Sequence, residues 1–216
     1  MPPALGDRRG VTTFDTNLIA VLVKAAVGPT ADALVKRLAA GVWLKDALGK
    51  TVAYSRSPGY LLYQLQGHPY TTLFQYVHAP PGGPTADLAR TLSEAMATRV
   101  IYFANSDTGG VTTFEAYDGG RLLERCHAGH GLEFSSTLRD ASECPQDGAW
   151  IYPFVDMLVH EHDAFVPAWF PAVLPTLPGA PREGPVSLDA SLLGVDVDYP
   201  DGLPAPLFVR VDYVAV

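Results

Sequence analysis

The order of apolar and polar positions divides the chain into short strands and two helices. The run at 17–25, NLIAVLVKA, is dense in Leu, Ile and Val, which predicts a strand buried on both faces. Other β-branched, aromatic or alternating runs predict the remaining strands, at 51–56, 60–66, 70–78, 100–104, 111–117, 121–126 and 207–216.

Two stretches have helical spacing instead. In residues 31–40, Leu34 and Leu38 stand one turn apart, and Gly41 is expected to end the helix. In Ala86–Met96, two leucines and the methionine fall on one face, away from the charged residues. Both segments therefore predict short amphipathic helices.

Each predicted helix follows the same word, Gly-Pro-Thr-Ala-Asp, at 28–32 and again at 83–87. The Gly and Pro end the incoming strand, the Thr hydroxyl can cap the first turn, and the Asp suits the helix dipole. The order strand, corner, helix, strand, turn, strand recurs at 17–66 and 70–117, although identity outside the word is poor.

This recurrence predicts an α+β fold with two βαββ-type units. The order resembles the ferredoxin-like pattern, so we expect a mixed or antiparallel sheet with both helices side by side on one face. Ser57-Pro58-Gly59 predicts a hairpin between the flanking strands. We expect residues 1–125 to form this duplicated unit, and the Pro-rich segment 126–216 to cover the sheet within one compact domain.

Composition narrows the class of protein. Hydrophobic residues make up 48% and charged residues 18%, which is typical of a globular chain. The net charge of −8 and the lack of a dense basic cluster argue against nucleic acid and anionic membranes, and favour a basic protein partner or a neutral small molecule. We find no signal peptide or membrane span and expect a cytoplasmic protein, with pairing of Cys126 and Cys144 left open.

The densest ionisable cluster lies at 160–163. If residues 154–163 form the helix that their pattern suggests, then Asp156, His160 and Asp163 share one face. The carboxylates would raise the pKa of the histidine and offer a general base to a hydrolytic enzyme, with or without a metal. A solvated helix face explains the same residues without chemistry.

A second group has the donor atoms of a zinc site. It comprises Cys126, His127, His130 and Cys144. No CxxC pair is present, and adjacent Cys and His residues point apart on a strand, so the preferred interpretation is half-buried cysteines with loop histidines. We therefore expect no cofactor.

Tyrosines are concentrated on the predicted central strands. Tyr60, Tyr63, Tyr76 and Tyr102 would form a protein-binding surface if their sheet face were open, and would be core if it were covered. The sequence leaves both alternatives open.

Familiar catalytic signatures are missing from the chain. It contains no GxSxG elbow, no phosphate loop, no HExxH motif and no GxGxxG. We therefore expect a non-catalytic binding protein, regulatory or toxin-neutralising like an immunity protein, with a basic partner. The alternatives are the hydrolytic enzyme at His160 and a small-molecule sensor domain.

Overall fold

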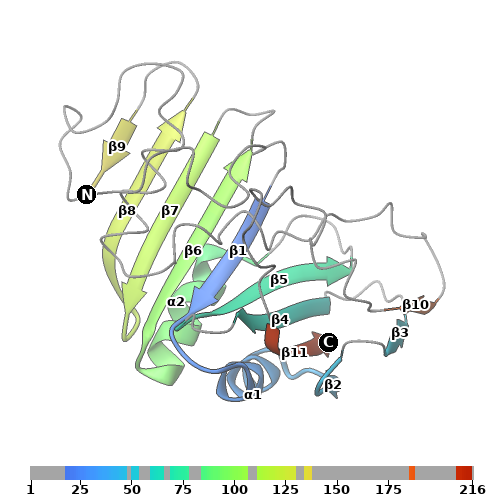
Figure 1. Cartoon of the computed structure of the whole chain (residues 1–216). Helices are drawn as coiled ribbons and strands as arrows, with labels where there is room; N and C mark the ends of the chain where they lie inside the picture. The colour runs from blue at the N-terminus through green and yellow to red at the C-terminus, as the bar shows by residue number, and fades with distance from the viewer. Residues whose placement is uncertain are drawn as a thin grey trace, which may run out of the picture.

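A computed structural model describes residues 18–47, 50–53, 59–65, 69–77, 84–106, 111–129, 134–137, 185–187 and 208–215. These residues form two helices and eleven strands (Figure 1). In chain order the elements are β1 (Leu18–Val23), α1 (Val27–Leu38), β2 (Val42–Leu44), β3 (Thr51–Ala53), β4 (Gly59–Leu65), β5 (Thr71–Val77), α2 (Ala86–Met96), β6 (Arg99–Ser106), β7 (Val111–Asp118), β8 (Arg121–Gly129), β9 (Phe134–Ser136), β10 (Pro185–Ser187) and β11 (Phe208–Ala215).

Nine of these strands form one sheet in the order β2-β11-β4-β5-β1-β6-β7-β8-β9, and every pair in it is antiparallel. The other two, β3 and β10, pair separately. The predicted α+β class is therefore confirmed. Both edges of the large sheet, β2 and β9, are three residues long. Short edges limit pairing with other chains.

The helices cross over between strands that run in the same direction. β1 and β4 are parallel because each pairs antiparallel with β5 between them, and α1 lies between them in the chain. In the same way, α2 links β5 to β6 around β1. The helices contact each other and share one apolar core cluster on one sheet face (Figure 1).

The repeated word acts differently in its two copies. In the second copy, Thr85 caps α2 by accepting a 3.1 Å bond from the Leu88 amide, and the helix has the predicted bounds. In the first copy, α1 begins at Val27, four residues earlier than predicted. Thr30 then lies inside the first turn, where its hydroxyl donates to the Ala26 carbonyl at 2.9 Å. Pro29 is tolerated because first-turn amides lack helical partners.

Both helices end at an alanine in the left-handed conformation. Ala39 follows α1 with φ 49°, and Ala97 follows α2 with φ 48°. The prediction that Gly41 closes the first helix was wrong, since the backbone reverses two residues before it. A left-handed alanine costs about 1–2 kcal/mol through its Cβ.

The predicted hairpin at Ser57-Pro58-Gly59 was also wrong. β3 pairs with β10, whereas β4 pairs with β5 and β11. Gly59 instead makes room for a ring on β11, because a Cβ there would lie 2.3 Å from the Tyr213 hydroxyl oxygen. The hairpins β6–β7 and β7–β8 are present, and the second turns through Gly119 and Gly120, both at positive φ.

The central strands are buried on both faces, as the continuous apolar run of β1 predicted. Val21 and Val23 pack with the helices in the shared core cluster. On the opposite face, Leu22 and Phe103 are no more than 1% exposed. The predicted C-terminal strand is present as β11 inside the sheet, between β2 and β4.

Most of the C-terminal segment lies outside the described residues. This holds for the predicted helix 154–163 and for all of the Pro-rich stretch 167–185 except its last residue, which begins β10. The division at residue 125 and the covering extension therefore stay predictions.

Candidate functional site

Polar side chains form a row across strands β6, β7 and β8 on the helix side of the sheet. Tyr102 stands opposite Glu115, which stands opposite Arg125. The preceding row contains Tyr117 and Leu122, which belong to or pack against the helix-covered core. Tyr102 also packs against that core, so the row of Glu115 lies at its margin. We call the surface of Tyr102, Thr113, Glu115, Arg125 and His127 the open face.

The Glu115 carboxylate is almost buried and is fully engaged. It accepts bonds from Arg125 Nε at 2.9 Å and from Arg125 Nη2 at 3.3 Å, and the Tyr117 hydroxyl donates to the same carboxylate. The side chain of Glu115 is 10% exposed, whereas that of Arg125 is 54% exposed. The guanidinium therefore reaches solvent while a buried group fixes one of its edges.

The two tyrosines beside Glu115 are hydrogen-bond donors at neutral pH. Burial, together with the bond and the negative charge from Glu115, raises the pKa of Tyr117 to about 12. Burial and, to a smaller extent, the same charge raise the pKa of Tyr102. Bonding to Glu115 and its charge also raise the pKa of Arg125. The open face thus presents protonated donors, which suit the binding of acceptor groups.

The next row on the same face contains a threonine and a histidine. Thr113 Oγ1 and His127 Nδ1 lie 3.1 Å apart, and His127 is exposed. The backbone of Arg125 is also fixed from its other side, because its amide donates to Thr137 Oγ1 at 2.9 Å and its carbonyl accepts from the Thr137 amide at 3.0 Å. Arg125 is consequently positioned through both its backbone and its side chain.

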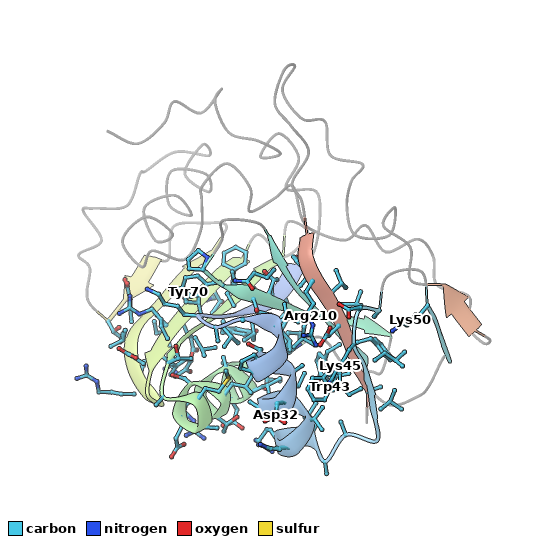
Figure 2. All side chains as sticks on the ribbon, turned by 60° about the horizontal axis from the view of Figure 1, so that its bottom comes forward. Asp32, Trp43, Lys45, Lys50, Tyr70 and Arg210 are labelled. Carbon is cyan, nitrogen blue, oxygen red and sulfur yellow. The ribbon has the colours of Figure 1, made fainter. Side chains whose placement is uncertain are left out.

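A second buried carboxylate, Asp212, is on β11, which pairs with β2 and contacts α1; Figure 2 labels its neighbours Trp43 and Arg210. Asp212 has no exposed surface and accepts four bonds: two from Arg210 at 2.6 and 2.7 Å, one from Trp43 Nε1 at 2.9 Å and one from the Asp46 amide at 3.1 Å. Burial by itself would raise the pKa of Asp212, but these bonds outweigh burial and lower it. Lys45 lies over the Trp43 ring, with Nζ 4.4 Å from its centroid.

This second cluster is structural. Its donors come from β2, β11 and the residues after β2, so it fastens the edge strand to the sheet. Because all four bonds converge on one carboxylate, its oxygens are occupied by the protein itself.

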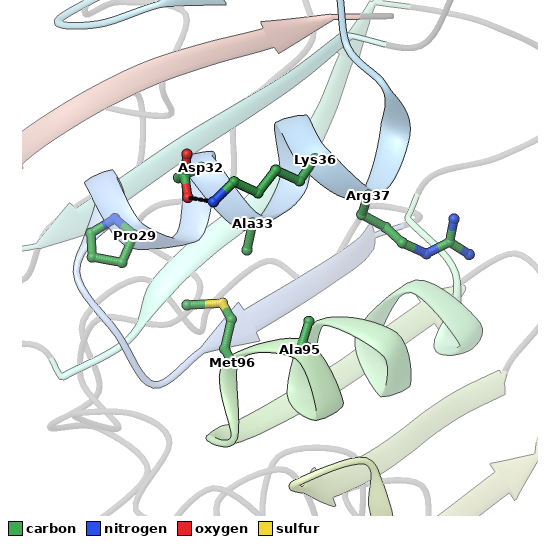
Figure 3. Close-up of a pocket in the computed structure, with 7 residues that line it drawn as sticks. All are labelled: Pro29, Asp32, Ala33, Lys36, Arg37, Ala95 and Met96. Atoms are coloured by element: carbon green, nitrogen blue, oxygen red, sulfur yellow. Dashed lines mark hydrogen bonds and ion pairs between the residues drawn. The ribbon is translucent and has the colours of Figure 1, made fainter.

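A shallow hollow of about 520 Å³ lies between the outer surfaces of α1 and α2 (Figure 3). Its charged residues are engaged by neighbours: Lys36 Nζ lies 2.6 Å from Asp32, and Arg37 donates to Thr91 at 3.3 Å. The lining residues are Pro29, Asp32, Ala33, Lys36, Arg37, Ala95 and Met96.

Most residues of the two predicted chemical sites lie outside the described residues. This applies to Asp156, His160 and Asp163, and to His130 and Cys144 of the zinc candidate. Cys126 and His127 are consecutive on β8, and only the His127 side chain is described. Within the described part of the chain, no three His, Cys, Asp or Glu side chains gather as a metal site would require. Both hypotheses stay untested.

The four tyrosines proposed for binding are in different environments. Tyr60 is 7% exposed and Tyr63 is 2% exposed, so both lie in the core. Burial raises the pKa of both. Tyr76 is on β5, with its side chain outside the described residues, and Tyr102 is on the open face.

Glu115 and Arg125 were not predicted as site residues from the sequence. Their signal was present in VTTFEAYD, where Thr113, Glu115 and Tyr117 alternate with Phe114 and Ala116. A polar series on alternate positions of a strand indicates an open sheet face. The partner strand could be assigned only through the turn at 118–120.

Comparison with known proteins adds no relative: the chain matches no protein-family model, no curated protein and no solved structure. Neither helix of the described part has the length and apolar character needed to cross a membrane.

Proposed function

We propose that the chain is a non-catalytic, cytoplasmic binding protein that contacts a protein partner through the open face. The observation that supports this most is the state of Arg125, which is half exposed yet held by a nearly buried carboxylate. Arginine and tyrosine are enriched among the residues that dominate binding energy in interfaces.

Preorganisation is the physical reason why this arginine suits binding. Ordering a flexible side chain at an interface costs about 0.5–1.5 kcal/mol, and the side chain of Arg125 is already held by Glu115 before a partner arrives. The neighbouring Tyr102 adds a donor with an apolar ring. A rigid, donor-rich patch of this kind binds without first rearranging.

Charge supports a basic partner, and the acidic excess lies outside the described residues. The chain has 15 basic and 23 acidic residues, of which the described residues contain 10 and 8. The acidic excess is thus in the remaining residues. We propose that a basic, toxin-like or regulated protein is attracted by these residues and oriented by the open face.

The strand order also supports a fold that is more specific than the α+β class. The order β6-β1-β5-β4, with α1 and α2 each crossing over one strand, has the connectivity expected of a ferredoxin-like core. We propose that this core was extended at one side by β11 and β2 and at the other by β7, β8 and β9. The extension on the second side provides the open face.

Affinity capture from cells that produce the protein tests the proposal. The bait carries Arg125→Gln, and the matched control carries Arg121→Gln, an exposed arginine at the start of the same strand. We expect a basic protein to be captured by wild type and control, to be lost with Arg125→Gln, and to dissociate as salt is raised. Equal capture by both variants would contradict the role of the open face.

A further inference from the structure

We infer that Arg125 receives a carboxylate side chain of the protein partner, through the edge of its guanidinium that Glu115 does not use. This inference rests on the proposed function and names the chemical group that the open face recognises.

Glu115 occupies only one edge of the Arg125 guanidinium. An arginine has five N–H groups, arranged as a side edge (Nε and Nη2) and an end edge (Nη1 and Nη2). The bonds to Glu115 use Nε and Nη2, which is the side edge. The end edge keeps a pair of parallel donors. Because 54% of the side chain is exposed, these donors can bond a planar acceptor that has two oxygens.

The neighbours of this edge favour an acceptor over a donor. Tyr102 and Arg125 flank Glu115 on either side, and each carries hydrogen-bond donors at neutral pH. The oxygens of Glu115 are taken by Arg125 and Tyr117. The donors of a partner's lysine or arginine would therefore face donors of this chain, whereas the oxygens of a carboxylate could accept hydrogen bonds from them.

The two donors of the end edge distinguish a carboxylate from an amide. A carboxylate offers two acceptor oxygens and can take both N–H bonds, whereas the side-chain amide of glutamine offers one oxygen and an NH2 group that would face the second donor. We therefore expect glutamate to be preferred to glutamine by about tenfold, the ratio that corresponds to about one hydrogen bond.

The test uses capped pentapeptides, acetyl-Ala-Ala-X-Ala-Ala-amide, with Glu, Gln or Lys at X. Each is titrated into the whole, isotope-labelled protein while the Nε–H signal of Arg125 is followed by NMR. We expect the Glu peptide to shift this signal saturably, the Gln peptide to bind about tenfold more weakly, and the Lys peptide to leave it unchanged. Sodium acetate is titrated as well, to separate a small carboxylate from a peptide-borne one.

Two variants complete the design. Arg125→Lys keeps a positive charge for Glu115 but lacks the end edge, and should lose the preference for Glu, whereas Arg121→Gln should retain it. Equal affinity for Glu and Gln peptides would overturn the inference, as would acetate binding as tightly as the Glu peptide. If capture depends on Arg125 while the Glu preference is missing, the proposed function stands and this inference fails.

Discussion

Replacing Asp212 by Asn would disturb a fully buried carboxylate that accepts four hydrogen bonds. Asn has nearly the same size but no charge, and its amide nitrogen would face donors from Arg210, Trp43 or Asp46. The carboxylate has no exposed surface, so water cannot replace the lost partners. The variant should therefore be less stable.

The structure sets the size of the effect. Removing one partner of a buried ion pair costs about 3–5 kcal/mol when the remaining charge stays buried. Arg210 is 31% exposed, so water can partly solvate the charge left behind. We expect a loss of about 2–4 kcal/mol in the free energy of unfolding.

The loss should depend on pH. Hydrogen bonds hold the pKa of Asp212 below its ordinary value in the folded protein, so the unfolded chain binds the proton more readily. The stabilisation is complete above the unfolded value of about 3.9 and disappears as the pH falls through the folded value. The difference between wild type and Asp212→Asn should consequently shrink in acid.

Urea unfolding followed by circular dichroism measures both effects, at about pH 7 and in steps down to about pH 3. As a companion, Arg210→Met with Asp212→Leu should recover only part of the stability, because no buried charge remains but the Trp43 and Asp46 donors lose their acceptor. The reasoning is refuted if Asp212→Asn lies within about 0.5 kcal/mol of wild type, or if the difference is the same at every pH.

Three further substitutions test the fold. Gly59→Ala should cost about 1–3 kcal/mol by clashing with Tyr213, and Tyr213→Phe should relieve part of that cost in thermal unfolding; additive effects would argue against the contact. Ala97→Gly should stabilise by about 1 kcal/mol by removing a left-handed alanine, whereas Ala95→Gly in the helix should destabilise by a similar amount; shifts of equal sign in denaturant midpoints would contradict this. Thr85→Ala should lower stability by about 1 kcal/mol, and an unchanged midpoint would disprove the cap.

The sequence determined those features that depend on local spacing. The bounds of α2 followed from its leucines and its capping threonine, because residues on one helical face repeat every three to four positions. The strands β1, β5, β7 and β11 followed from apolar runs and alternation in the same way. The pairing of helices on one face followed from the doubled order of strand and helix.

Tertiary structure decided what depends on contacts between distant residues. Gly59 resembles a turn glycine in the sequence, but its reason is a tyrosine about 150 positions later on β11. The helix α1 starts earlier than predicted because backbone hydrogen bonds, beginning with Thr30 to the Ala26 carbonyl, extend it through Gly28 and Pro29. The open face likewise arose from register: Tyr102, Glu115 and Arg125 are spaced unremarkably in the chain, and only antiparallel pairing of three strands aligns them.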